Sequence, residues 1–329
     1  MAESTNISEP KPGLMSRRRF IRNTTLSVGA TAAGSAAGIA LIQKASQPAQ
    51  RESLPTSEPD INYINPELAP FINDHPMLIN FSDYHRAVAA QRTEQEIYDY
   101  KREKNPRFAS LKEAVIEDVS QRARNSASYQ MLIDEKANLL GFKPDSFVRK
   151  VAPAVIFVES EGEEGSNLFQ LEPVIAQAIA NELGIDLGKD RKHLLNPHVN
   201  TMIALEYMSR LYKLFPDPTL AIWAFNLGET IMANAIYAYV MSTAKSEAQE
   251  EFIKNKFKSK SEAATTYYVG FLKINFVDLS QSQAAVDSIR ADLANLGEPF
   301  EYHQNYVPKV LAGDFLIQQA QETKVRFPS

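Results

Sequence analysis

The sequence contains no cysteine and only five histidines, and both shortages narrow the chemistry open to it. Without cysteine there is no disulfide, no thiolate nucleophile, no cysteine-based zinc site and no lipid attached through sulfur. The histidines form no HExxH pattern and no other closely spaced set of metal ligands: His75, His85, His193, His198 and His303. We therefore expect no metal ion and no cofactor, and a surface or structural role for each histidine.

The sequence also has no excess of positive charge. The net charge is −5 and the isoelectric point is about 5.7, whereas a nucleic-acid-binding domain is normally strongly basic. We therefore expect no nucleic-acid partner. What the chain does have is length and apolar content: 329 residues, of which 44% are hydrophobic, are enough for one or two domains with a real core.

The first part of the chain, residues 1–46, has the pattern of an export signal. The basic cluster Ser-Arg-Arg-Arg-Phe-Ile-Arg at residues 16–22 precedes a run without charge from Asn23 to Gln43. The cluster resembles the twin-arginine signal S-R-R-x-F-L-K, which implies export in the folded state to the periplasm or another extracytoplasmic compartment. No clean A-x-A cleavage site follows, and the run is long enough to span a bilayer. An uncleaved membrane anchor is therefore the alternative to a cleaved signal.

Most of the remaining chain shows helical spacing. Residues 47–80 are rich in Pro, Ser, Asn and charge and predict an extended linker that Ile61, Tyr63, Ile64 and Phe71 partly hold in place. Residues 81–143 predict a helical extension, which begins with an exposed, charged helix at about 84–103. No stretch alternates like a strand with hairpin turns, so the sequence predicts a mainly α protein without internal repeats.

Residues 144–160, PDSFVRKVAPAVIFVES, predict a buried helix that ends in a carboxylate. Pro153 lies within it and predicts a kink or an earlier helix start. Glu159 follows a dense apolar run, and burial would raise the pKa of its carboxyl because the charged form loses solvation. Taken alone, the segment fits the polar end of a core helix better than a catalytic acid.

Four later segments change that balance because of their order along the chain. They are Leu168–Pro173 with Gln170, Asn196-Pro197-His198-Val199-Asn200 followed by Phe215 and Asp217, Phe225-Asn226-Leu227-Gly228, and Pro299 with Tyr306-Val307-Pro308-Lys309-Val310. Together with Glu159-Ser160, this series resembles the soluble lytic transglycosylase family over about residues 148–313. The resemblance implies a lysozyme-like catalytic domain, at 144–313, that cuts peptidoglycan glycan strands.

The resemblance also implies residue roles. Glu159 would protonate the glycosidic oxygen between N-acetylmuramic acid and N-acetylglucosamine and then act as the base while the sugar's 6-hydroxyl attacks. The product would be a 1,6-anhydromuramoyl end. Five further residues would bind substrate: Ser160, Gln170, Phe225, Asn226 and Tyr306. Of these, Phe225 would pack beneath the cleft, and Ser160 would orient either the acetamido region of the substrate or the acid. Asn226 as a helix cap and Gln170 as a surface residue are the structural alternatives.

The departures from the family pattern leave two other functions open. The loop after Glu159 is short and acidic, Asn167 takes the place of a glycine, and Tyr302 and His303 replace a Glu-Thr pair. In a hydrolytic muramidase, Glu161, Glu163 or Glu164 would position a water. In a non-catalytic peptidoglycan-binding or scaffold protein, the altered loop would close the cleft.

Two stretches complete the predicted organisation. Residues about 230–297 predict a helical insertion, either a solvated elaboration or a surface for a protein partner, and residues 314–329 a C-terminal tail. The insertion carries a second T-x-x-Y-V, at Thr265, Tyr268 and Val269, which competes with the segment of Tyr306. We favour the later copy because Pro299 has the expected spacing.

Overall fold

The computed structural model describes four stretches of the chain: residues 64–102, 112–163, 165–259 and 261–326. They belong to one unit, Pro59–Ser329, and the export signal predicted at 1–46 lies outside the described residues. Within them there are helices and no strand, which confirms the mainly α class. The elements are α3 (Ala69–Asp74), α4 (Asp83–Arg102), α5 (Lys112–Ser128), α6 (Gln130–Leu139), α7 (Phe147–Glu159), α8 (Pro173–Glu182), η2 (Lys189–Leu195), α9 (Pro197–Leu214), α10 (Pro218–Leu227), α11 (Glu229–Ser242), α12 (Glu247–Ser259), α13 (Ser261–Leu272), α14 (Phe276–Gln281), α15 (Gln283–Leu296), η3 (Phe300–Tyr302) and α16 (Tyr306–Arg326).

Helix α7 is buried along nearly its whole length, as its apolar density predicts. Residues 151–157 are all buried, and α5, α6, α9 and α16 pack around the helix. Pro153 lies within α7 without ending it, and the helix begins at Phe147. Because α7 is fixed on several sides, Glu159 at its end has a well-defined position.

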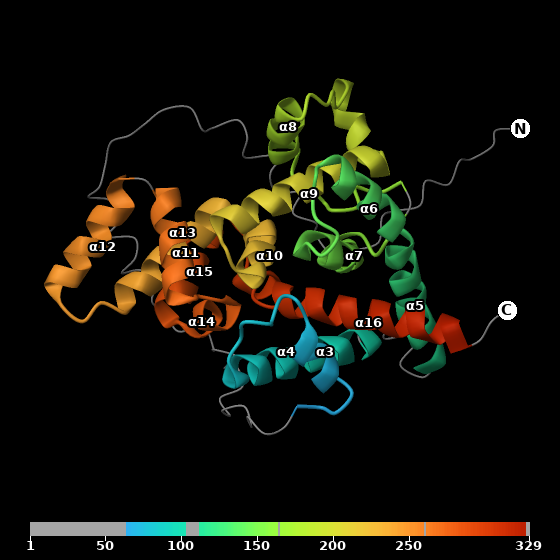
Figure 1. The fold of residues 1–329 in the computed structure, drawn as a ribbon, viewed down its shortest axis with the longest axis horizontal. Helices are drawn as coiled ribbons and strands as arrows, with labels where there is room; N and C mark the ends of the chain where they lie inside the picture. Colours follow the sequence, from blue (N-terminus) through green and yellow to red (C-terminus); the bar gives the residue numbers. More distant parts are fainter. Residues whose placement is uncertain (1–63, 103–111, 164, 260, 327–329) are drawn as a thin grey trace, which may run out of the picture. The chain divides into compact units, whose positions relative to one another are not determined.

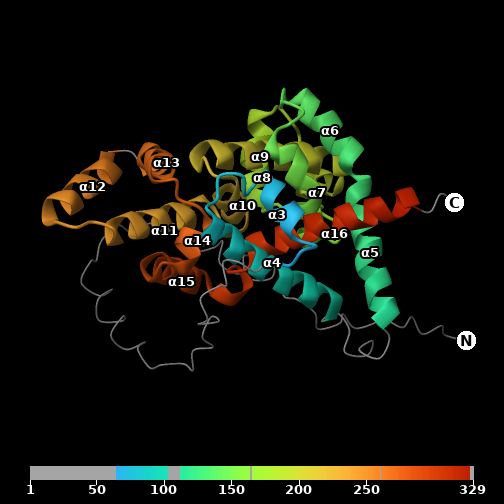
Figure 2. The ribbon, with the colours of Figure 1, turned by 60° about the horizontal axis from the view of Figure 1, so that its bottom comes forward.

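Helix α16 runs alongside α4, and both views of the ribbon show the two helices as neighbours (Figures 1 and 2). It also packs closely on α7 at Gly313, where an added Cβ would lie 2.8 Å from the Phe157 ring. The C-terminal tail predicted from residue 314 is helical as far as Arg326, because α16 continues through it and buries Phe315, Leu316 and Ile317. The family pattern ends near residue 313, but the apolar face of the helix does not.

Residues 64–80 form part of the folded core, so the predicted linker is wrong for this half of 47–80. Leu68, Ile72, Met77 and Leu78 are buried. The segment contacts α16 through the Phe71 and Phe315 rings, whose centroids are 5.4 Å apart. His75 is also buried, with Nε2 lying 3.0 Å from Asp314 Oδ2. The spacing of apolar residues does not predict this burial, because α3 is short and the chain on either side of it is irregular.

Helix α4 is buried along one face, which corrects the prediction of an exposed helix at 84–103. Its buried face consists mostly of small or polar side chains that do not register as an apolar stripe: Ala87, Val88, Ala89, Ala90, Thr93, Glu96 and Ile97. Thr93 satisfies its hydroxyl by donating to the Ala89 carbonyl at 2.7 Å. Alanines allow α4 and α16 to pack together at this face.

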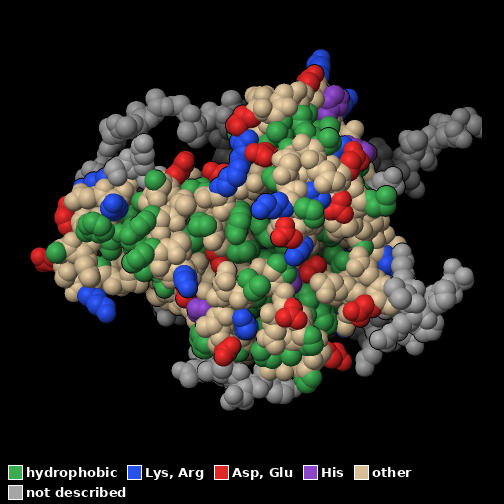
Figure 3. Space-filling view, in the orientation of Figure 1, with side chains coloured by type: hydrophobic (Ala, Val, Ile, Leu, Met, Phe, Trp, Pro, Cys, Tyr) green, Lys and Arg blue, Asp and Glu red, His purple; other side chains and the backbone are tan. Residues whose placement is uncertain are grey.

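The region predicted as an insertion, 230–297, is helical but not merely a solvated elaboration. Helices α11 and α15 pack on one another and bury apolar side chains: Ile231, Met232, Ile236, Val240, Ile289 and Leu293. Helices α12 and α13 instead expose Phe252, Tyr267 and Phe271, and Figure 3 shows hydrophobic side chains at the surface over these two helices. Among the described helices, none is long and apolar enough to cross a membrane.

Candidate active site

The carboxylate of Glu159 meets the phenol of Tyr306. Glu159 is the last residue of α7 and is half-buried, and Tyr306 is the first residue of α16 and is 3% exposed. The Tyr306 hydroxyl donates to Glu159 Oε1 at 2.6 Å, across 147 residues of sequence. The first and last segments of the predicted series therefore form one site.

The competing T-x-x-Y-V segment does not take part in this contact. Its Tyr268 lies in α13, where its ring stacks on that of Phe257 at 5.5 Å. The Tyr268 hydroxyl is buried and has no hydrogen-bond partner among the described residues. The later copy, which carries Tyr306, is the one that reaches the carboxylate.

The acidic loop after Glu159 is held against α5. Glu161 and Gly162 both have positive φ angles, of 59° and 71°. A Cβ on residue 162 would lie 2.9 Å from Ser126 N, so only glycine fits there. The Glu161 carboxylate is paired with Arg122 Nη1 at 2.5 Å, while Glu163 is exposed. Glu164 lies outside the described residues.

A partly buried tyrosine from α4, Tyr100, lies close to these carboxylates. The Tyr100 ring packs edge-on against Phe157 of α7, with centroids 5.1 Å apart. Burial raises the pKa of Tyr100 well above its usual range, and the negative charges of Glu96, Glu161 and Glu159 raise it further. The phenol is therefore neutral at physiological pH and adds no negative charge to this side of the site.

Gln170 lies on a turn that is built by two buried asparagines. Its φ is +47°, and its backbone N–H donates to the Asn167 carbonyl at 2.9 Å. Asn167 Oδ1 accepts from Leu171 N and from Asn200 Nδ2, at 3.1 and 2.6 Å, and Asn200 Oδ1 accepts from Phe169 N at 3.1 Å. The residue in the family glycine's place is thus the centre of the turn, a role that the sequence pattern did not indicate.

Asn226 belongs to a second polar group, centred on His303. The His303 ring lies between Asn226 and Glu298: Nδ1 is 2.7 Å from Asn226 Oδ1, and Nε2 is 2.9 Å from Glu298 Oε2. The backbone carbonyl of His303 accepts from Trp223 Nε1 at 2.9 Å and from Tyr306 N at 3.2 Å. The turn at 303–306 therefore connects Asn226 on α10 to the Glu159–Tyr306 pair.

The comparison with known families covers the first part of this site. Residues 150–249 match the family model described as the transglycosylase SLT domain. This stretch of the chain is similar to a transglycosylase SLT domain. The match supports lytic transglycosylase activity in general, with peptidoglycan as the substrate. No curated protein and no solved structure matches the chain.

The residues of the site come from inside and outside the SLT match. Glu159 and Asn226 lie inside it, as does the predicted substrate-binding residue Gln170, whereas Glu298, His303 and Tyr306 lie beyond residue 249. Sequence reasoning missed Glu298, although it noted His303 as a departure from the family pattern. A buried histidine beside two potential acceptors is a long-range arrangement, and only the folded chain reveals it.

Two predicted residues of the SLT domain have mainly structural contacts. The Ser160 hydroxyl donates to the Ile156 carbonyl at 3.2 Å, one turn back along α7, and Ser160 is only 6% exposed. Phe225 is also 6% exposed, and its ring packs on Tyr207 of α9 with centroids 5.6 Å apart. Phe225 thus supports the end of α10 that carries Asn226, and the substrate role of Ser160 stays a prediction.

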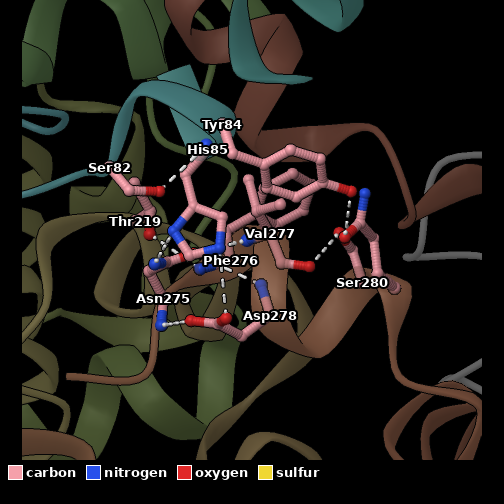
Figure 4. Close-up of polar contacts among 10 residues, drawn as sticks. Ser82, Tyr84, His85, Thr219, Asn275, Phe276, Val277, Asp278 and Ser280 are labelled. Carbon is pink, nitrogen blue, oxygen red and sulfur yellow. Dashed lines mark hydrogen bonds and ion pairs between the residues drawn. The ribbon is translucent and has the colours of Figure 1, made fainter. Parts of the chain in front are cut away.

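The other end of α10 is fixed by a network of helix caps. Asp217 accepts hydrogen bonds from the N–H groups of Thr219 and Leu220 and from the Thr219 hydroxyl, which in turn accepts from Phe276 N at 3.0 Å. Phe276 opens α14, where Asn275 forms a capping box with Asp278. Figure 4 shows His85 of α4 reaching this box, with its ring nitrogens 3.0 Å from Asn275 Nδ2 and 3.3 Å from Asp278 Oδ1.

A pH-dependent stability is expected from Asp217. Burial raises its pKa from 3.8 to about 6, against the hydrogen bonds that lower it. Between pH 4 and 6 the native state therefore binds more protons than the unfolded state, so the free energy of unfolding falls as pH rises. Relative to Asp217→Asn, which keeps an acceptor oxygen at the cap, wild type should lose about 2–3 kcal/mol between pH 4 and 7.

Urea denaturation of both proteins at several pH values measures this difference. Asp186→Asn is the control, because that carboxylate is exposed and caps only a loop N–H. If the difference between wild type and Asp217→Asn stays constant with pH, the Asp217 carboxyl is not the source of the dependence.

Proposed function

We propose that the protein cleaves the β-1,4 bond between N-acetylmuramic acid and N-acetylglucosamine in peptidoglycan and leaves 1,6-anhydromuramoyl ends. The observation that carries the proposal is the 2.6 Å hydrogen bond from Tyr306 to Glu159. It holds the carboxyl group of Glu159 in a defined position at the end of a buried helix. Glu159 protonates the glycosidic oxygen as the bond breaks, which is general acid catalysis.

The second half of the reaction needs a base but no water. The substrate's N-acetyl group stabilises the developing cation, and the 6-hydroxyl of the same sugar attacks the anomeric carbon. The Glu159 carboxylate, now deprotonated, takes the proton from that hydroxyl. Acid and base are then one residue, and the atoms balance without a co-reactant.

The ion pair of Glu161 favours this mechanism over hydrolysis. Glycosidases that act on water ordinarily use two carboxylates, one on each side of the scissile bond. Glu161 is the nearest described candidate in sequence, but Arg122 holds its carboxylate against α5. The muramidase alternative would therefore depend on Glu163 or Glu164, and the scaffold alternative would need no carboxylate at all.

Digestion of purified sacculi separates the three functions. We expect soluble muropeptides whose reducing ends are lighter by the mass of one water than those from a hydrolase. Products with full reducing ends would establish a muramidase instead. Binding to sacculi without any soluble product would establish the scaffold.

We also propose that the chain is exported by the twin-arginine pathway and acts outside the cytoplasm. The supporting feature is the basic cluster followed by an uncharged run, which is cleaved or stays as a membrane anchor. Replacing Arg17 and Arg18 together by lysine should retain the protein in the cytoplasm, as measured by cell fractionation. If the variant is distributed between the cell fractions as wild type is, export by the twin-arginine pathway is contradicted.

A further inference from the structure

The imidazole of His303 is fixed from both sides. It is 5% exposed, with Asn226 Oδ1 at Nδ1 and Glu298 Oε2 at Nε2. The amide oxygen of Asn226 can only accept a hydrogen bond, so Nδ1 is the donor in that contact, and Nε2 lies within hydrogen-bond distance of the Glu298 carboxylate. The ring cannot turn without losing two hydrogen bonds, one of them to a charged group, and these are the stronger kind.

Glu298 is placed by the end of helix α15. Gly297 ends that helix in the left-handed conformation, with φ of 73°. The next backbone N–H, that of Glu298, donates to the Leu293 carbonyl at 2.9 Å, which completes the turn. The region predicted as an insertion therefore delivers a carboxylate to the site through its last helix.

The backbone of His303 is fixed by the same face of α10. Trp223 and Asn226 are three residues apart and therefore lie on one side of the helix. Trp223 donates to the His303 carbonyl, and Asn226 meets the His303 ring. Tyr306, whose N–H donates to the same carbonyl, reaches Glu159. The position of Asn226 is thus tied to that of the catalytic acid proposed above.

The direction of the hydrogen bond decides what Asn226 offers to a ligand. Its carbonyl oxygen accepts from His303, which leaves the two hydrogens of its amide nitrogen. Among the described residues these hydrogens have no hydrogen-bond partner. If the ring were rotated or absent, the amide could turn over and present its oxygen instead, since both ends of the group have the same shape.

We propose that Glu298 and His303 are positioning residues, which hold the Asn226 amide so that it donates to an oxygen of the glycan. This inference rests on the proposed function and adds to it the polarity of one contact with the substrate. The group donated to is a hydroxyl or acetamido oxygen, both of which are acceptors. His303 and Glu298 themselves act through Asn226.

Two substitutions of His303 separate this role from simple packing. Asparagine can place a polar atom close to the position of Nδ1, so His303→Asn keeps a contact with Asn226 and loses the one with Glu298. Glutamine can place one close to Nε2, so His303→Gln keeps the contact with Glu298 and loses the one with Asn226. Both remove the same ring and should lower the melting temperature by similar amounts.

The kinetic expectation follows from the contact that each variant keeps. In digestion of sacculi by the full chain, His303→Gln should lower kcat/KM about tenfold or more, as expected for the loss of one aligned hydrogen bond. His303→Asn, which loses only the contact with Glu298, should show a smaller loss, of about threefold. Adding His303→Gln to Asn226→Ala should cost little more than Asn226→Ala alone, because the two act as one unit. Equal losses in both His303 variants, or additive losses in the double variant, would overturn the proposal.

A second measurement does not depend on activity. In the full chain labelled with ¹⁵N-asparagine, the side-chain amide signal of Asn226 is identified by its loss in Asn226→Ala. Its shifts in His303→Asn should resemble wild type, and in His303→Gln they should move toward those of a free amide. Identical shifts in all three proteins would refute the positioning role. A wild type that releases no product would instead refute the proposed function, whatever these shifts are.

Discussion

Glu159→Gln should release almost no soluble product from sacculi, with a rate about a thousandfold below wild type. Glutamine cannot give a proton to the glycosidic oxygen or take one from the 6-hydroxyl, and general acid–base catalysis contributes about 10²–10⁴ in rate. The fold should be unaffected, because the glutamine carbonyl can still accept from the Tyr306 hydroxyl. The measurement is the initial rate of muropeptide release, with the melting temperature recorded in parallel.

The matched control for this experiment is Glu161→Gln. It removes a carboxylate two residues away, one that is paired with Arg122, and should keep most of the activity. Wild-type rates in Glu159→Gln would refute the assignment of the acid. An equal loss in both variants would instead point to a pair of carboxylates and to hydrolysis.

Trp223→Ala should destabilise the protein by about 3–5 kcal/mol, the range for deleting a large buried aromatic side chain. Trp223 is the only tryptophan of the chain and is fully buried, with its ring 4.9 Å from that of Phe276. It also donates to the His303 carbonyl, so its loss loosens the turn that leads to Tyr306. Chemical denaturation followed by circular dichroism measures the change without needing the tryptophan signal.

Trp223→Phe isolates the hydrogen bond from the packing. The phenylalanine keeps most of the contact with Phe276 but cannot donate to His303, so we expect a loss of about 1–2 kcal/mol. If Trp223→Ala costs no more than Trp223→Phe, the ring does not fill the core in the way that its burial implies.

The sequence predicted the parts of the site that lie in recognisable segments. The structure brings Glu159 and Tyr306 together, and Tyr306 belongs to the later of the two competing segments, the one that the spacing from Pro299 favours. The buried helix α7 was evident from its uninterrupted apolar run. These features could be predicted because each depends on a short stretch of sequence, and the family resemblance gave the order in which the segments combine.

The features that the sequence did not predict depend on contacts between distant segments. The alanine-rich face of α4 and the irregular chain around Ile72 bury themselves against α16, which no periodicity within either segment can indicate. Glu298 carries no motif and matters only because the end of α15 brings it to His303. Asn167 looked like a departure from a glycine, yet its side chain can make hydrogen bonds that a glycine could not.

The contact of His75 with Asp314 joins residues 239 positions apart. Such a contact cannot form on the ribosome until residue 314 has been synthesised, and its formation costs the chain entropy of closing a long loop. Proteins dominated by pairings of long sequence separation also fold slowly. Because α16 carries both Asp314 and Tyr306, assembly of the Glu159–Tyr306 pair should be among the last events of folding, after the earlier helices have already collapsed.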